Sequence, residues 1–196
     1  ALICGTGTAL FVRDGEKITR FGGWGNLFDG GGSAYDIGRD AICYLLECEE
    51  CFTEELSSPL NKLVREKLGA SAHESLTSIY AKGKSYIASF APLAVQCWLA
   101  GDGVATAMVK ENLERIAHLV TVAAAHVPNA RQVVCGGSLL TQNEAFRNIL
   151  KTLLPQRLQV EPVAYPPIWG ACLQSAKLAG LPAPDPNIFM DSYRED

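Results

Sequence analysis

Four glycine-rich segments interrupt this chain, and they constrain its fold more than any other feature of the sequence. Backbone N–H groups can close around an anionic oxygen only where no Cβ intrudes and where φ can be positive. Three of the four segments, those that lack tryptophan, are therefore candidates for binding a phosphate or a nucleotide. The four are Gly5-Thr6-Gly7-Thr8, Gly22-Gly23-Trp24-Gly25, Asp29-Gly30-Gly31-Gly32-Ser33 and Cys135-Gly136-Gly137-Ser138.

The start of the chain is predicted to be β-rich. Leu2 to Cys4 forms a short apolar strand, and the chain opens as if this strand were already under way, so we expect its beginning to lie elsewhere. Leu10 to Val12 and Lys17 to Phe21 are predicted as two further strands. Asp14-Gly15 between them favours a hairpin turn.

Helices are predicted through the middle of the chain. Ser33 followed by Asp36 indicates a capping box, and Ser58-Pro59 places an N-cap before a proline at the first helical position. Gly69 suits the end of that second helix. Further helices are predicted around Glu74 to Ala81, over Ser85 to Ala100 and after Asp102-Gly103.

Strands and helices alternate in the last third of the chain. Strands are predicted at Gln132 to Cys135 and Leu158 to Val163, and helices at Glu144 to Leu154 and Ile168 to Leu178. This order predicts an α/β fold in which helices cover a sheet. The proline-rich remainder, residues 181–196, is expected to be a surface tail.

Charge and hydropathy argue against two classes of partner. The formal net charge is −4, from 17 basic and 21 acidic residues without a basic patch, which disfavours nucleic acid. The most apolar stretch, Tyr86 to Ala100, contains Pro92 and Gln96 and is too short to span a bilayer. We therefore expect neither nucleic-acid nor membrane binding.

Cysteine usage indicates a reducing compartment. The seven cysteines are odd in number and scattered through apolar segments, so a disulfide framework is not expected. Cys48 and Cys51 have the CxxC spacing, but no second pair accompanies them and His73 is distant in sequence. We expect a cytoplasmic protein without a metal site of its own.

Each glycine-rich segment has a functional and a structural interpretation. The hydroxyls of Thr6 and Thr8 could add donors to a phosphate-binding turn, or they could stabilise an ordinary turn. Trp24 could cover the face of a sugar, or it could fill the core beneath a loop. Asp29 could hold a sugar hydroxyl or hydrated Mg²⁺, or it could favour the following helix N-terminus by its charge alone. Gly136-Gly137 could let a base or ribose lie on the backbone, or form a simple strand-to-helix turn.

The order of the four segments resembles one family. The stretch CGTGTALFVRDGEKITRFGGWGNLFDGGGSAYDIGRDAI is similar to the pattern of N-acetylglucosamine kinases and their BadF/BadG/BcrA/BcrD ATPase relatives. There, a GTGS turn precedes a hairpin, then GGWG, then GDEGS-x-Y-x-IG. VVCGGSLL resembles the adenosine motif of the family, and YPPIWGACLQSAKLAG resembles its closing helix. The resemblance extends from Ala1 to Gly180.

The resemblance implies an actin-like (ribonuclease H-like) ATPase and sugar kinase fold, with ATP and sugar bound between two domains. Residues 1–180 would form the C-terminal domain, with a helical insert at about 55–100, and the N-terminal domain would be the partner that this chain lacks. The catalytic aspartate would lie in that missing part, so no catalytic residue is assigned here and the chain alone is expected to be inactive. A homodimer is also compatible with the resemblance.

Site residues follow from the same resemblance. Gly5, Thr6, Gly7 and Thr8 would bind the phosphates of ATP, which is expected with Mg²⁺. Gly23, Trp24 and Asp29 would lie on the sugar side, and Gly136, Gly137 and Ser138 would flank adenosine. Phosphoryl transfer depends on positioning and charge neutralisation, which backbone loops can supply.

One departure from the family pattern concerns the sugar loop. The acidic pair of the family aligns with Gly30 and Gly31, and Asp29 stands one place earlier. The expected function is phosphorylation of N-acetylglucosamine, glucosamine or N-acetylmuramic acid. Two alternatives stay open: an activator-type ATPase of the same superfamily, which would use cysteines to hold an iron–sulfur cluster, and a sugar- or nucleotide-binding protein without catalysis.

Overall fold

The computed structural model describes residues 1–52 and 54–193 of the chain. The chain forms two compact units, Ala1–Pro162 and Val163–Asp196. The first unit contains a sheet, a group of helices and all four glycine-rich segments. It therefore holds every residue that the sequence singles out for a site.

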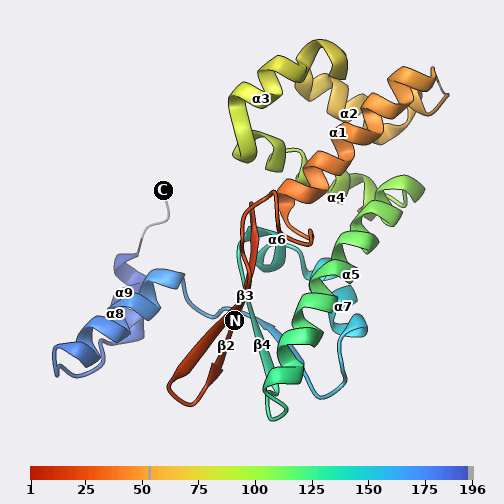
Figure 1. The fold of residues 1–196 in the computed structure, drawn as a ribbon. Helices are drawn as coiled ribbons and strands as arrows, with labels where there is room; N and C mark the ends of the chain where they lie inside the picture. Colours follow the sequence, from red (N-terminus) through yellow and green to blue (C-terminus); the bar gives the residue numbers. More distant parts are fainter. Residues whose placement is uncertain (53, 194–196) are drawn as a thin grey trace. The chain divides into compact units, whose positions relative to one another are not determined.

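A five-stranded mixed sheet runs through the first unit in the order β3-β2-β1-β4-β5 (Figure 1). Its strands are β1 (Leu2–Cys4), β2 (Thr8–Asp14), β3 (Lys17–Gly22), β4 (Gln132–Gly136) and β5 (Gln159–Pro162). The first three form an antiparallel meander, and the predicted hairpin is confirmed because Asp14 pairs with Lys17. Gly15 has a φ of 59°, the positive value that this tight turn needs.

The parallel pairing of β1 with β4 decides where the site forms. Leu2 lies opposite Cys135, and Ile3 lies opposite Gly136. Neighbouring parallel strands end at the same edge of a sheet. The segment after β1, Gly5 to Thr8, therefore meets the segment after β4, Gly136 to Ser138, although most of the chain separates them in sequence.

The predicted helix caps are confirmed. Ser33 begins α1 (Ala34–Cys51) with a capping box, in which its hydroxyl accepts from the Asp36 amide and the Asp36 carboxylate accepts from the Ser33 amide. Ser58 caps α2 (Pro59–Leu68), which ends at Gly69 with a φ of 76°. Asp102 caps the long helix α5 (Gly103–His126), whose amide at Ala105 donates to its carboxylate.

The prediction of one helix from Ser85 to Ala100 was wrong. The structure has α3 (Ala72–Ala88) and a separate α4 (Ala91–Leu99). Proline has no N–H to donate to the preceding turn and clashes with its carbonyl, so Pro92 lies in the first turn of a new helix.

Helix α3 is itself interrupted. Gly83 has a φ of 70° and a ψ of −162°, a conformation that is essentially restricted to glycine. The helix begins earlier than predicted, at a capping box formed by Ser71 and Glu74. That start had a sequence signal, because serine followed three residues later by glutamate is a typical N-terminus.

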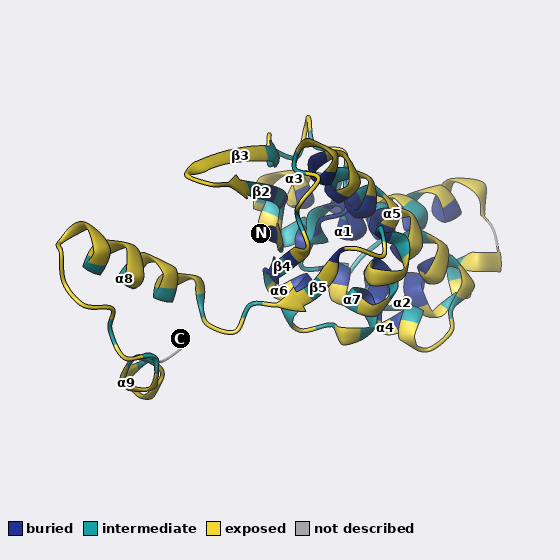
Figure 2. Cartoon of the chain, turned by 90° about the horizontal axis from the view of Figure 1, so that it is seen from below, coloured by how far each residue is buried: buried dark blue, intermediate teal, exposed yellow. Residues whose placement is uncertain are grey.

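Most of the core lies among the helices of the first unit, where buried residues gather around α1, α4 and α5 (Figure 2). The remaining helices of this unit are the short η1 (Glu54–Ser57), α6 (Ser138–Thr141) and α7 (Glu144–Leu153). Leu45, Leu113 and Phe146 are among its fully buried side chains. In the described residues, no helix is long and apolar enough to cross a membrane.

The second unit contains α8 (Pro167–Leu178) and α9 (Pro186–Ser192). A row of aromatic rings connects them, with centroids 5.6 Å apart for Tyr165–Trp169 and 4.9 Å apart for Trp169–Phe189. Helix α9 falls in the segment expected to be a tail and was not predicted. Asp185 caps it by accepting from the Asn187 amide.

A buried carboxylate joins α1 to the start of α3. Glu49, with a side chain 7% exposed, accepts from the Ala72 amide at 3.0 Å and from Arg65 at 3.1 Å. A ring nitrogen of His73 lies 3.2 Å from the same carboxylate. Burial opposes ionisation of Glu49, but the Ala72 amide, His73 and Arg65 outweigh it, so its pKa is lowered from the ordinary 4.5.

We expect Glu49→Gln to lower the free energy of unfolding at pH 7 by about 1.5–3 kcal/mol, because charge-assisted hydrogen bonds are lost. A lowered pKa stabilises the fold fully above the ordinary value of 4.5. The advantage of the wild type should therefore be complete at pH 7 and shrink as the pH falls through the lowered pKa of the folded state. Denaturant unfolding across this pH range measures the effect. Exposed Glu47→Gln on the same helix is the control, and an equal loss there would refute the role of Glu49.

Candidate functional site

Gly137 lies between β4 and α6 and packs against Cys4, at the end of β1. Its φ is 84° and its ψ is 147°, a conformation that side chains disfavour. A Cβ on Gly137 would stand 2.3 Å from the carbonyl oxygen of Cys4. Only glycine allows the backbones of the two segments to approach so closely, and this explains why a glycine is needed after β4.

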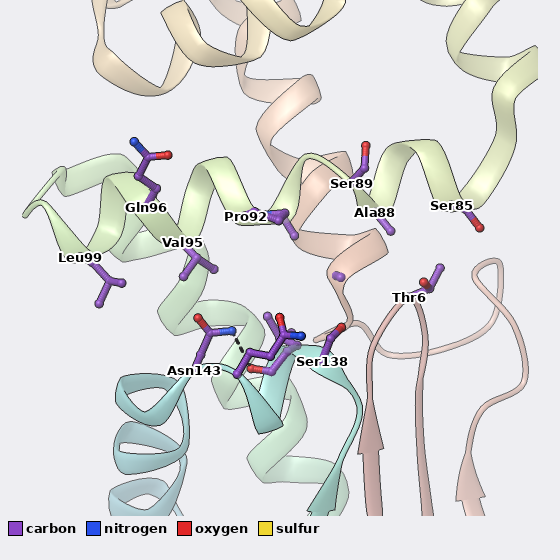
Figure 3. A pocket seen from close by; sticks show the side chains of 14 residues that line it. Thr6, Ser85, Ala88, Ser89, Pro92, Val95, Gln96, Leu99, Ser138 and Asn143 are labelled. Atoms are coloured by element: carbon purple, nitrogen blue, oxygen red, sulfur yellow. Dashed lines mark hydrogen bonds between the residues drawn. The ribbon is translucent and has the colours of Figure 1, made fainter. Parts of the chain in front are cut away.

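A cavity of about 570 Å³ opens above these segments (Figure 3). Its floor comes from the turn after β1 and from α6, and its roof comes from the end of α3 and from α4. None of its lining side chains is ionisable. The lining residues are Thr6, Ala34, Ser85, Ala88, Ser89, Ala91, Pro92, Val95, Gln96, Leu99, Ser138, Leu139, Gln142 and Asn143.

The cavity is elongated, and its two ends differ. Thr6 and Ser85 face each other at one end, and Leu99 and Asn143 lie at the other (Figure 3). Asn143 is held in place because its amide donates to the carbonyl of Leu139 at 3.0 Å. The first end lies beside the GTGT turn, whereas the second offers apolar and amide groups of the kind that bind a flat base.

The GTGT turn brings only one of its two hydroxyls to this cavity. Thr6 is exposed and lines it, whereas Thr8 is 5% exposed and its hydroxyl lies 3.4 Å from the Cys4 thiol. The Gly5 amide donates to the Gly7 carbonyl at 3.0 Å, which closes the turn. The Gly5 carbonyl accepts from the first amide of α1, at Ala34, so the turn and the helix N-terminus are joined.

The GGWG segment forms a separate loop whose tryptophan is not in the core. Trp24 is 61% exposed, and the guanidinium of Arg20 lies 4.5 Å from its ring centroid. Arg20 also donates to the carbonyls of Gly22 and Gly23. The Trp24 ring is therefore exposed, and a cation–π contact with Arg20 holds it in place.

Asp29 holds this loop closed. One of its carboxylate oxygens accepts from the Trp24 amide at 2.8 Å, and the other accepts from the Gly25 amide at 3.0 Å. Both oxygens are thus engaged within the loop. This arrangement differs from the expectation that Asp29 reaches outward to a sugar hydroxyl or to hydrated Mg²⁺.

A second cavity, of about 500 Å³, lies between α5 and the loop that contains Gly22 and Asp29 to Gly31. Sequence reasoning missed its helical wall, because α5 lies some eighty residues beyond the loop and carries no motif. The wall residues are Glu111, Glu114, Arg115, His118, Leu119 and Val122, and they face Thr8, Gly22, Asp29, Gly30 and Gly31.

Arg115 explains the unusual glycine at position 31. Gly31 has a φ of 98°, and a Cβ there would stand 2.7 Å from a guanidinium nitrogen of Arg115. Glu111 pairs with the same guanidinium at 2.6 Å. A residue with a side chain at position 31 would therefore require Arg115 to move.

Asn112 connects the loop at Gly32 to helices α1 and α5. It is fully buried, and its carbonyl accepts from the Gly32 amide at 3.1 Å. Its amide donates to Asp40 on α1 at 2.9 Å and to the Met108 carbonyl at 3.0 Å. Gly32 has no room for a side chain, because a Cβ would stand 2.4 Å from Ile116.

Replacing Asn112 by leucine should lower the free energy of unfolding by about 2–3 kcal/mol, because the buried Gly32 amide loses its partner. Leucine keeps a similar volume, so the loss reports hydrogen bonding and not a cavity. Equilibrium unfolding in urea measures it. Lys110→Gln, at an exposed position two residues earlier, should change stability by less than about 0.5 kcal/mol. Equal stability of Asn112→Leu and wild type would show that this hydrogen-bond network is unimportant.

The part of the chain that the structure describes contains no candidate cluster of metal ligands. No three His, Cys, Asp or Glu side chains there lie together in a way that could hold an ion. Cys48 and Cys51 share helix α1, but the first is buried and the second is exposed.

A model of the BadF/BadG/BcrA/BcrD ATPase family matches residues 1–173. The chain belongs to this family. The sequence resemblance is therefore confirmed, and ATP is the nucleotide that the name of this ATPase family implies.

Three further proteins are similar to this chain. An N-acetylmuramic acid/N-acetylglucosamine kinase of Clostridium acetobutylicum is 33% identical over 114 residues, which cover 56% of this chain and 37% of that protein. A structure from Porphyromonas gingivalis, named as an N-acetylglucosamine kinase, superposes with a TM-score of 0.66 at 18% identity. It is matched over 92% of this chain and 60% of its own.

A structure with the same kind of name from Chromobacterium violaceum has a TM-score of 0.59 at 19% identity, over 82% of this chain and 54% of its own. These structures establish the predicted α/β, actin-like ATPase fold. The chain spans between 37% and 60% of the length of these relatives.

Proposed function

We propose that this chain of the BadF/BadG/BcrA/BcrD family is the C-terminal actin-like domain of an ATP-dependent amino-sugar kinase. In this proposal the domain comprises residues 1–180, with a helical insert at about 55–100, and it works with an N-terminal domain. The observation that carries the proposal is the elongated cavity, which has Thr6 of the GTGT turn at one end and Ser138 of the CGGS segment on its floor. Its volume of about 570 Å³ suits a nucleotide-sized ligand.

The geometry supports one orientation of ATP. The adenosine would lie on Gly136, Gly137 and Ser138 and reach toward Leu99 and Asn143, where the lining is uncharged. The phosphates would then point toward Thr6 and the turn from Gly5 to Thr8. Such a turn orients phosphates through backbone N–H groups, and phosphoryl transfer needs this positioning more than covalent chemistry.

Mg²⁺ normally accompanies ATP and is held by phosphate oxygens, waters and one or two carboxylates. No carboxylate lines the 570 Å³ cavity in the described residues. The residues that line this cavity therefore do not fit a Mg²⁺ site. We place any carboxylate ligand of the ion, and the aspartate that would act as base on the sugar hydroxyl, in the N-terminal domain.

The sugar would lie against Gly23 and Trp24, since an exposed tryptophan can stack on a sugar ring. Asp29 would act indirectly, by holding the amides of Trp24 and Gly25 in place. N-acetylglucosamine, glucosamine and N-acetylmuramic acid are the sugars we propose. The named activities of the relatives support the first and the last.

One observation favours sugar binding without catalysis as a second candidate function. Arg115 occupies the space above Gly31, where the family pattern has an acidic residue. The loop is thus arranged for glycine and not for that acidic side chain. If the acidic residue is essential to transfer, the protein would bind sugar and leave it unphosphorylated.

The test is a coupled ADP-release assay on the full-length protein with a panel of amino sugars. Sugar-stimulated ADP release is expected, and mass spectrometry should find a phosphorylated sugar. Sugar binding without turnover would instead support the binding protein. Sugar-independent hydrolysis together with a visible absorption band would indicate the activator-type ATPase with its iron–sulfur cluster.

The isolated chain provides a second measurement. We expect it to show no kinase activity, because the proposed base lies outside it. Measurable sugar phosphorylation by the purified 196-residue chain would contradict this assignment.

A further inference from the structure

A lysine that no motif of the sequence singled out lies beside the GTGT turn, next in sequence to the cavity-lining Ser85. The Nζ atom of Lys84 lies 3.1 Å from the position that a Cβ on Gly7 would take. It also lies 5.9 Å from the ring centroid of Tyr35, in the first turn of α1. Lys84 therefore reaches over the GTGT turn from α3, about eighty residues later in the sequence.

The break in α3 accompanies this placement. Gly83, with its φ of 70° and ψ of −162°, interrupts the helix one residue before Lys84. The next residue, Ser85, lines the cavity opposite Thr6 (Figure 3). The interruption at Gly83 therefore directly precedes two groups near the GTGT turn, the Lys84 ammonium group and the Ser85 hydroxyl.

Within the described residues, Lys84 has no acidic partner, because none of the ion pairs found there includes it, and the Tyr35 ring is the aromatic contact of its charge. Its side chain is partly buried. Lysines on solvated faces usually extend into water, whereas this one is directed at a glycine turn. An ammonium group in such a position suits an anionic ligand, since lysine acts as a point charge on phosphates.

The cavity itself needs such a charge. Its lining is neutral throughout, whereas a triphosphate carries several negative charges. We infer that Lys84 binds the phosphate chain of the nucleotide at the GTGT turn. This inference rests on the proposed ATP-dependent function, and it adds a side chain on the helical region to a site otherwise built from backbone loops.

The experiment compares the affinities of the full-length protein for ATP, ADP and adenosine by isothermal titration calorimetry. Lys84→Gln should weaken ATP binding by roughly 10- to 100-fold, because a charge-assisted contact is lost. Adenosine affinity should stay within about twofold, since adenosine has no phosphate. Lys84→Arg, which keeps the charge, should restore part of the ATP affinity. Lys82→Gln is the matched control, because Lys82 is exposed on the same helix and lies over Tyr86.

Gly83→Ala provides a second variant. A Cβ on Gly83 would meet nothing within 4 Å, so its effect can come only from the backbone conformation. If the break positions Lys84, this variant should also weaken ATP more than adenosine. Its far-UV circular dichroism and melting temperature show whether it is folded.

The outcomes separate the inference from the function. If the wild type binds ATP and Lys84→Gln binds it equally well, the role of Lys84 is refuted while the nucleotide site stands. An equal loss of ATP and adenosine binding would also refute it, because that pattern indicates a structural role. If the wild type binds neither nucleotide nor nucleoside, the proposed function itself fails.

Discussion

Replacing Gly137 by alanine is expected to lower the free energy of unfolding by about 3 kcal/mol or more and to abolish nucleotide binding. Two costs combine. The φ of 84° disfavours any side chain, and a Cβ would lie 2.3 Å from the carbonyl oxygen and 2.5 Å from the carbonyl carbon of Cys4. Neither backbone can give way without disturbing the pairing of β1 with β4. The turn at Gly5 to Thr8 would move with it.

Gly15→Ala is the control, because it carries the conformational cost of a positive φ without a steric clash. Gly15 also has a positive φ, 59°, but a Cβ there would meet nothing within 4 Å. Alanine at this position should cost about 1 kcal/mol from conformation alone. Chemical denaturation followed by circular dichroism measures both variants, and titration with ATP follows the binding. Similar losses in the two would mean that the close approach to Cys4 contributes nothing.

Replacing Gly38 by alanine should lower the free energy of unfolding and the ATP affinity to a comparable extent, by displacing α3, whose end lines the cavity. Gly38 is buried in α1, where a Cβ would stand 2.0 Å from the carbonyl oxygen of Ile87 in α3. Helix α3 would have to move away from α1, at a cost of about 3 kcal/mol. Ser85, Ala88 and Ser89 lie at the end of α3 and line the cavity, so they would move with that helix. ATP affinity should therefore fall as well.

Gly103→Ala is the control for this variant. Gly103 is the first residue of α5 and has open space around it, so alanine should be neutral or slightly stabilising. Thermal unfolding of the three proteins, with and without ATP, gives both stability and ligand-induced stabilisation. A Gly38→Ala protein that melts like the wild type would show that the contact between α1 and α3 is adaptable.

Much of the local structure near the site was predictable from short patterns. The capping box at Ser33, the cap at Ser58-Pro59 and the hairpin turn at Asp14-Gly15 all formed where the residues indicated. Each depends on hydrogen bonds and backbone angles within a few residues, and such patterns are visible in sequence. The resemblance added the order of the four glycine segments, which no single pattern contained.

The side chains that meet these segments could not be predicted in the same way. Lys84, Asn112 and Arg115 lie on helices that have ordinary amphipathic patterns and no motif. Their importance comes from what lies opposite them, namely Gly7, Gly32 and Gly31. The split between α3 and α4 was also missed, because the apolar run around Pro92 matches one long helix as well as two short ones.

The sequence by itself determined the secondary structure around the glycine segments and the family, because both depend on the kinds of residue and their local spacing. Only the tertiary structure decided which hydroxyl of the GTGT turn lines the cavity, what Asp29 holds and which cation lies beside that turn. Those facts depend on the parallel pairing of β1 with β4 and on the packing of α3 and α5 over the loops. Such contacts join residues far apart in the chain, and the free energy that selects them belongs to the packed molecule and not to any short segment of it.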